Sequence, residues 1–212
     1  MKHKINKVIL PASLLSAIVS GSFSQTQQPN IVIIHTDEHN FRTLGCYREC
    51  LQNEQAFPWG KEAVVETPHI DRLAHQGVLF TRCYATSPVS SPSRASFMSG
   101  LYPQNNGVWT NDMVLSDAAV TFGESLRQNG YATGYIGKLH LNGKGRPEWH
   151  PKRDFGFSDN RYMYNRGHWK KIEETAEGQT FRKDADVKST DKQTFPTDYF
   201  TTQAIEFINR HK

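Results

Sequence analysis

The chain has 212 residues, of which 37% are hydrophobic and 22% charged, which is typical of a soluble globular domain with a sizeable core. Its formal net charge of +4 comes largely from Lys2, Lys4 and Lys7, because residues 1–24 hold these lysines and no acidic residue. The rest of the chain has a formal charge of +1, so charge gives no argument for a nucleic-acid partner.

Residues 1–24 have the features of a secretory signal peptide. A basic start precedes an apolar stretch from Val8 to Val19, and small residues follow it as far as Ser24. That stretch is too short to cross a membrane as a mature helix. We therefore predict cleavage after Ser24, a periplasmic or secreted protein and no membrane span in its mature form. An N-terminal membrane anchor is the alternative.

The first element expected after the leader is a strand. The continuous run Ile31-Val32-Ile33-Ile34 is typical of a strand buried on both faces of a parallel sheet. Asp37 and Glu38 follow it, at the carboxyl end where open α/β sheets bind ligands.

A helix is expected to connect this strand to a second one. Thr67 and Pro68 form a capping residue and a first-turn proline, and Gly77 can end the helix they begin. Apolar residues over 78–84 then predict the second strand.

The second strand leads to the most informative run of the chain, Ser90-Ser91-Pro92-Ser93-Arg94. Pro92 suits a first helical turn and Gly100 suits a helix end. We expect Ser90 to lie just before a helix N-terminus, where free N–H groups favour an anion, with Arg94 one turn inside the helix. The alternative is an ordinary Ser/Pro turn before a small helix.

A third strand is expected near the middle of the chain. Thr121 and Glu124 form a capping box that opens a helix. The following residues 131–137 predict a strand that delivers Lys138 and His140 to the same edge as the earlier strand ends.

The alternation of strands and helices predicts an α/β fold with a layered sheet and helices on both faces. Residues 143–195 are rich in charged and polar side chains with scattered aromatics, and we expect long loops there. Pro196 or Thr197 begins a last helix with an apolar face.

Several of these segments, in the same order, resemble the type I sulfatases, which belong to the alkaline-phosphatase superfamily. The resemblance covers most of residues 29–157 and returns in the helix after Thr197. Its segments are Pro29 to Asp37, Thr67 to Ala74, Ser90 to Gly100 with Leu101-Tyr102-Pro103 and Gly107-Val108, and Gly137 to Leu141, with a weaker similarity at Asp154-Phe155-Gly156-Phe157.

The resemblance implies an alkaline-phosphatase-like fold and a role for each matched residue. Ser90 would be oxidised to formylglycine (3-oxoalanine), which attacks sulfur in a sulfate ester, and Asp37 and Ser90 would bind Ca²⁺ or Mg²⁺. Arg94 would stabilise the formylglycine hydrate, and Lys138 would bind sulfate and the hydrate. His140 would take a hydroxyl proton, so that sulfate is expelled and the aldehyde returns.

The residue types fit that chemistry, because sulfate ester hydrolysis needs positive charge around the non-bridging oxygens. Taken singly, each residue has a structural alternative. Asp37 could cap a turn, Lys138 could be a solvated strand end and His140 could be a core histidine. Glu38 departs from the Asp or Gln frequent in the family, and we include it as a third metal ligand.

A second departure is the lack of further metal ligands, a second sulfate-binding lysine and a leaving-group histidine in residues 143–212. We therefore predict that residues 25–212 are the N-terminal, truncated part of a sulfatase catalytic domain. We expect this piece to fold poorly and to be inactive alone.

The expected partners are a sulfated carbohydrate or small sulfate ester and a formylglycine-generating maturase. Aromatic and cationic residues over 143–170 would suit a sulfated sugar. Two other functions stay open: a phosphodiesterase or phosphonate hydrolase of the same superfamily, and a non-catalytic truncated binding protein.

Overall fold

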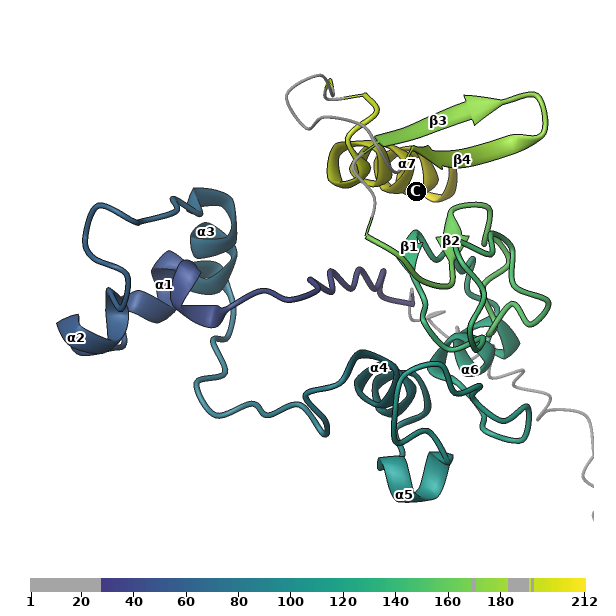
Figure 1. Cartoon of the computed structure of the whole chain (residues 1–212), viewed down its shortest axis with the longest axis horizontal. Coiled ribbons are helices and arrows are strands. Elements are labelled where there is room, and N and C mark those ends of the chain that lie inside the picture. The colour runs from purple at the N-terminus through teal and green to yellow at the C-terminus, as the bar shows by residue number, and fades with distance from the viewer. Residues whose placement is uncertain (1–27, 169–170, 183–190, 192) are drawn as a thin grey trace, which may run out of the picture. The chain divides into compact units, whose positions relative to one another are not determined.

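The computed structural model describes residues 28–168, 171–182, 191 and 193–212, which divide into two compact units (Figure 1). Unit 1 ends at Leu79, and unit 2 runs from Phe80 to Lys212. The predicted signal peptide, residues 1–24, lies outside the described residues. In the described part of the chain, no helix combines the length and apolarity needed to cross a membrane.

Unit 1 is built from short helices. The predicted helix after Thr67 is confirmed as α3, with Pro68 in its first turn. Thr67 occupies the N-cap position, but its side chain accepts no hydrogen bond from a backbone N–H of the helix. Its hydroxyl donates to the Asp71 carboxylate (3.0 Å). The elements of unit 1 are η1 (Phe41–Thr43), α1 (Gly45–Arg48), α2 (Asn53–Ala56) and α3 (Pro68–Gln76).

The two strands predicted around unit 1 are not formed. Residues 31–34 have no regular structure and are exposed, from 51% at Ile33 to 81% at Ile34. Residues 78–84 are equally irregular, and Phe80 is 68% exposed. A central parallel strand is stable only with hydrogen-bonded neighbours on its edges, and no strand pairing or β-bridge to either segment is present among the described residues.

Unit 2 contains four helices and two small sheets among its described residues. The predicted third strand is reduced to β1, which pairs in parallel with β2 through Gly137↔Met163 and Lys138↔Tyr164. The interval predicted as loops, 143–195, also contains the antiparallel hairpin of β3 and β4. The elements are α4 (Ser90–Ser99), α5 (Pro103–Asn106), α6 (Phe122–Gln128), β1 (Gly137–Lys138), β2 (Met163–Tyr164), β3 (Lys171–Thr175), β4 (Gly178–Arg182) and α7 (Pro196–His211).

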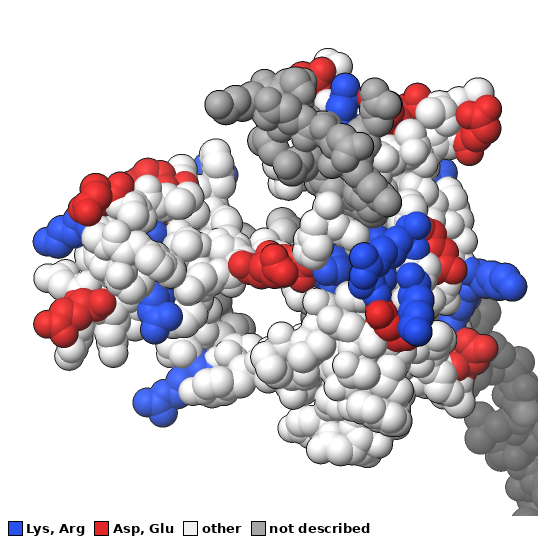
Figure 2. Space-filling model, in the orientation of Figure 1, with Lys and Arg blue, Asp and Glu red and all other residues white. Residues whose placement is uncertain are grey.

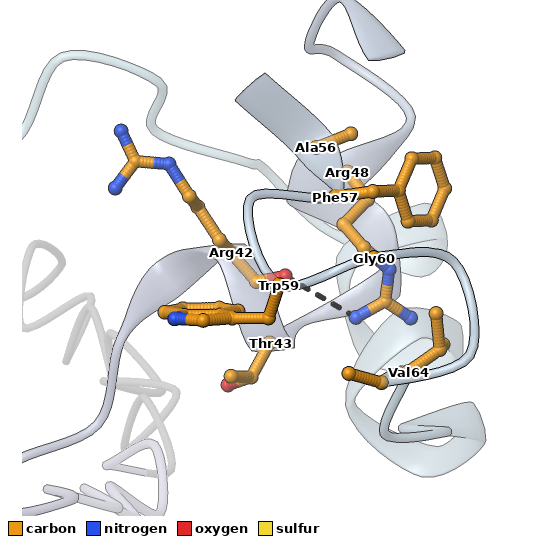
Figure 3. A pocket seen from close by; sticks show the side chains of 9 residues that line it. Arg42, Thr43, Arg48, Ala56, Phe57, Trp59, Gly60 and Val64 are labelled. Carbon is orange, nitrogen blue, oxygen red and sulfur yellow. Dashed lines mark hydrogen bonds between the residues drawn. The ribbon is translucent and has the colours of Figure 1, made fainter. Parts of the chain in front are cut away.

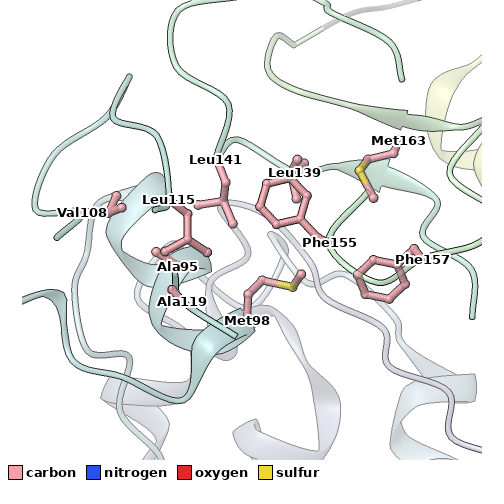
Figure 4. Close-up of a cluster of buried hydrophobic side chains, with 10 residues drawn as sticks. All are labelled: Ala95, Met98, Val108, Leu115, Ala119, Leu139, Leu141, Phe155, Phe157 and Met163. Atoms are coloured by element: carbon pink, nitrogen blue, oxygen red, sulfur yellow. The ribbon is translucent and has the colours of Figure 1, made fainter. Parts of the chain in front are cut away.

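The core of unit 2 joins α4 to the residues that follow β1 (Figure 4). Leu139 and Leu141 are fully buried on either side of His140, which fixes the backbone at that point. The members of the core are Ala95, Met98, Val108, Leu115, Ala119, Leu139, Leu141, Phe155, Phe157 and Met163.

The start of α6 is packed against the turn at residues 154–157. The predicted capping box is present: Thr121 accepts from the Glu124 N–H, and the Glu124 side chain accepts from the Thr121 N–H. Gly156 has φ +86°, and a Cβ there would lie 2.0 Å from the Glu124 nitrogen. Only glycine allows the backbone at residue 156 to come this close to α6. This contact explains why a glycine stands in the Asp-Phe-Gly-Phe run.

Candidate active site

Ser90 is the first residue of α4 and is half-buried. The sequence predicted it just before the helix, so the helix begins one residue earlier than expected. The next N–H, that of Ser91, donates to the side-chain oxygen of Asn111 (3.0 Å). Gly100 ends the helix in the left-handed conformation (φ 70°), as predicted.

Arg94 ties α4 to β1. Its buried guanidinium donates to the backbone carbonyl of Lys138, and the Tyr135 hydroxyl donates to the same oxygen (2.8 Å). The structure therefore brings Arg94 and Lys138 together through the backbone of Lys138. This hydrogen bond links the Ser90 helix to the strand that bears Lys138 and leads to His140.

His140 lies two residues beyond Lys138, the last residue of β1, and is 5% exposed. Its N–H donates to the Asn165 carbonyl (2.6 Å), and the preceding Leu139 N–H donates to the Tyr164 carbonyl (2.7 Å). His140 has φ 60°, a left-handed conformation that is strained in a residue other than glycine and that occurs often at functional sites.

Two charged residues that the sequence interpretation overlooked lie beside His140. One side-chain oxygen of Asp112 is 3.9 Å from the His140 Nε2, and the Arg166 guanidinium forms an ion pair with that same oxygen. Asp112 follows the Gly107-Val108 segment, and Arg166 follows β2. Nothing in their spacing predicts the contact, because it depends on the tertiary turn after β1.

Asp37 and Glu38 lie in unit 1, in an exposed stretch without regular structure. Glu38 has φ 54°, another left-handed non-glycine conformation. The described residues contain no group of three or more His, Cys, Asp or Glu side chains that could hold a metal ion. They do not form a complete metal site by themselves, and the metal stays a prediction.

The aromatic residues expected over the site pack on one another instead. Trp149 stacks on Phe181 with ring centroids 4.8 Å apart, and Tyr164 stacks on Phe200 at 5.6 Å. They connect β2, the β3–β4 hairpin and α7, so their rings are used in packing. Figure 2 shows Lys and Arg side chains gathered near β1 and β2, with acidic side chains at the edges of this group.

A pocket in unit 1 is too small to be the site (Figure 3). Its volume is about 10 Å³, room for no more than a single water molecule. Arg48, which lines it, donates to the backbone carbonyl of Arg42 (3.3 Å) and to that of Val65 (3.0 Å).

The sulfatase family model matches residues 29–211, so the chain belongs to the sulfatase family. An N-acetylgalactosamine-6-O-sulfatase of Bacteroides thetaiotaomicron is 40% identical over 121 residues, which cover 55% of this chain and 21% of that protein. An N-acetylglucosamine-6-O-sulfatase of the same organism is 29% identical over 215 residues, 100% of this chain and 34% of that protein. The chain thus spans about a third or less of these curated relatives.

Solved structures give the same assignment. A protein in complex with its substrate D-glucosamine-2-N,6-O-disulfate has a TM-score of 0.59 at 26% identity, over 88% of this chain and 32% of that chain. Ps i-CgsB in complex with k-i-k-neocarrahexaose has a TM-score of 0.61 at 27% identity, over 87% of this chain and 42% of that chain. These neighbours confirm the α/β fold class of alkaline-phosphatase type.

Proposed function

We propose that this chain is the N-terminal part of the catalytic domain of a sulfatase that hydrolyses sulfate esters of glycans. The observation that carries the proposal is the arrangement around Ser90. Ser90 is the first residue of α4. Arg94 of the same helix is hydrogen-bonded to the backbone carbonyl of Lys138, and His140 lies two residues after Lys138. This arrangement occurs in a chain that matches the sulfatase family over residues 29–211.

In the proposed reaction, the chain's residues bind sulfate, place the ester and move a proton. Oxidised to formylglycine, Ser90 would supply a hydrated aldehyde. One hydroxyl of the hydrate would attack sulfur, forming a new S–O bond as the ester S–O bond breaks, and its proton would leave with the released sugar alcohol. The Lys138 ammonium and the Arg94 guanidinium offset the negative charge around that hydroxyl and the sulfate oxygens. His140 takes a hydroxyl proton, so that sulfate is expelled and the aldehyde re-forms.

A divalent metal, Ca²⁺ or Mg²⁺, is part of the proposal. The carboxylates of Asp37 and Glu38 are the oxygen ligands that such hard cations prefer, and Ser90 would be a third ligand in its oxidised form. The remaining ligands would come from residues other than those described.

The proposed substrate is a sulfated carbohydrate. The two relatives compared above are named for 6-O-sulfated hexosamines, and a structural neighbour holds a sulfated glucosamine as its substrate. The basic side chains near β1 and β2 (Figure 2) suit such an anionic sugar. A signal peptide over residues 1–24, a periplasmic or secreted location and a maturase that oxidises Ser90 before folding complete the proposal.

The decisive experiment is tandem mass spectrometry of the protein purified from its own host. The tryptic peptide from Cys83 to Arg94 contains Ser90, and the proposal expects that residue to have lost two hydrogens. The same preparation is then assayed on sulfated saccharides, small sulfate esters, phosphodiesters and phosphonates. Intact Ser90 with phosphodiester or phosphonate hydrolysis would replace the sulfatase mechanism, and intact Ser90 without turnover would indicate a binding protein.

A further inference from the structure

We propose that Asp112 and Arg166 are positioning residues for His140, a role that rests on the proposed sulfatase function. The nearest carboxylate oxygen of Asp112 is 3.9 Å from His140 Nε2, and Arg166 contacts that same oxygen. The three residues come from separate segments: the loop before residue 114, the turn after β1, and the residues after β2.

The backbone holds these three segments together independently of the charges. The Leu115 N–H donates to the Leu141 carbonyl (3.1 Å), and Val114 forms an antiparallel bridge with Asn142. This pairing brings the chain segment that bears Asp112 alongside the segment that bears His140.

Asn165 fixes the third segment. It is fully buried, and its side-chain oxygen accepts from the Asn142 N–H (3.0 Å) while its amide donates to the carbonyls of Gly143 (2.9 Å) and Gly145 (3.0 Å). Its carbonyl accepts from the His140 N–H (2.6 Å). The next residue, Arg166, is therefore held beside the turn that carries His140.

Backbone conformation provides a second observation. His140 has φ 60° and Asp112 has φ 69°, a conformation that costs free energy in residues other than glycine. Two such residues face each other across this contact. The surrounding hydrogen bonds maintain the strained conformations, which is expected where side-chain direction matters to function.

The charges of Asp112 and Arg166 determine the electrostatic surroundings of the His140 ring. The side chains of His140 and Arg166 are only 6% and 14% exposed, and that of Asp112 is 32% exposed. The carboxylate oxygen is 3.9 Å from Nε2, beyond hydrogen-bond length, so it acts on the ring by charge and favours the positively charged form that His140 adopts on taking the hydroxyl proton. The Arg166 guanidinium balances the carboxylate, so that this partly buried cluster carries no uncompensated anion when His140 is neutral.

The test uses Asp112→Asn in the mature protein from its own host, with Asp117→Asn as the matched control. The Asp117 side chain is 93% exposed and lies on the same loop region. Removing the Asp112 charge is expected to lower kcat about 10–100-fold, the range known for residues that orient a metal-bound histidine, and to leave KM within about twofold. Asp117→Asn is expected to change neither.

A second measurement separates this inference from the proposed function. Tryptic cleavage after Lys138 and Lys144 gives a peptide with His140 as its single histidine, so its C2-hydrogen exchange can be followed by mass spectrometry. We expect a severalfold change in rate in Asp112→Asn and a smaller change in Arg166→Lys, which keeps the charge. If wild-type protein has intact Ser90 and no turnover, the proposed function fails and the exchange rate still tests the contact.

Each outcome decides the positioning role. Unchanged exchange at His140, or unchanged kcat in an active enzyme, would overturn it. If Asp112→Asn does not fold, Arg166→Lys is compared with Arg166→Met: recovery of kcat and of the exchange rate in the lysine variant alone supports the role, and equal behaviour of the two variants overturns it.

Discussion

Residues 90–165 and residues 28–40 carry different parts of the predicted site and differ in how they are held. The first segment contains Ser90, Arg94, Lys138 and His140, and its core residues Leu139 and Leu141 are fully buried. The second contains Asp37 and Glu38 in an exposed stretch, with Ile34 81% exposed. The difference shows that residues 90–165 contain the partners that stabilise them, such as Arg94 with Lys138, whereas a central parallel strand depends on neighbouring strands that residues 28–40 do not contain.

The largest expected effect concerns Ser90. Ser90→Ala removes the group that the maturase would oxidise, so sulfatase turnover of the mature host protein should fall below detection. Ser125→Ala, which removes one hydroxyl from α6, is the matched control and should keep turnover within about twofold because it removes one weak hydrogen bond. Substantial turnover in Ser90→Ala would contradict a nucleophile derived from Ser90.

Substitutions in the two segments should change the free energy of unfolding by different amounts. Leu139→Ala creates a cavity in the core and should lower the free energy of unfolding by about 2–5 kcal/mol. Ile34→Ala removes apolar atoms from an exposed side chain and should change it by less than about 0.5 kcal/mol. Urea unfolding followed by tryptophan fluorescence measures both. A comparable loss in Ile34→Ala would mean that residues 31–34 are packed in solution, as the sequence predicts for a strand.

The same contrast explains how much the sequence could predict. α3, α4, α6 and α7 were predicted because their caps, prolines and glycines act within a few residues. The strand at Ile31 to Ile34 was predicted from a composition that suits a buried parallel strand, but its hydrogen bonds need partners outside the segment. The β3–β4 hairpin was missed because its turn, Ala176-Glu177, lacks the Asn-Gly type of signal.

For the site, the sequence predicted which residues come after β1 and at the start of α4, because those depend on local motifs. It did not predict Asp112 or Arg166, whose contact with His140 is set by the tertiary turn. The sequence also suggested that the aromatics over 143–170 would suit a sulfated sugar, which stays a prediction, and the structure adds that the Trp149 ring stacks on Phe181. Residue type predicts chemistry, but only packing decides whether an aromatic face is still available.

A moderate effect is expected at the start of α6. The Thr121 hydroxyl accepts from the Glu124 N–H (3.2 Å) and donates to the Phe155 carbonyl (2.8 Å), and the residue is 1% exposed. Thr121→Val keeps the shape and loses both bonds, so the free energy of unfolding should fall by about 1–2 kcal/mol. Thr201→Val, at an exposed position of α7, is the control, and an equal loss there would show that the cap contributes nothing specific.

The smallest expected effect is the contribution of the Glu124 carboxylate to the free energy of unfolding, which is lost at acidic pH. Burial raises the pKa of Glu124, but the Thr121 N–H bond and the Arg153 guanidinium outweigh it and hold that pKa below its usual range. Because the carboxylate is favoured in the folded state, its contribution is complete above the unfolded-state pKa of about 4.3. That contribution is lost as pH falls through the lowered, folded-state pKa.

Glu124→Gln should therefore lower the urea midpoint at neutral pH and lose less stability than wild type as the pH is taken below about 4. Glu177→Gln, at the exposed hairpin turn, should follow the wild-type profile. Parallel profiles for wild type and Glu124→Gln would mean that the contacts with Thr121 and Arg153 do not favour the ionised carboxylate. The close fit of α6 against the turn at Gly156 would then rest on packing alone.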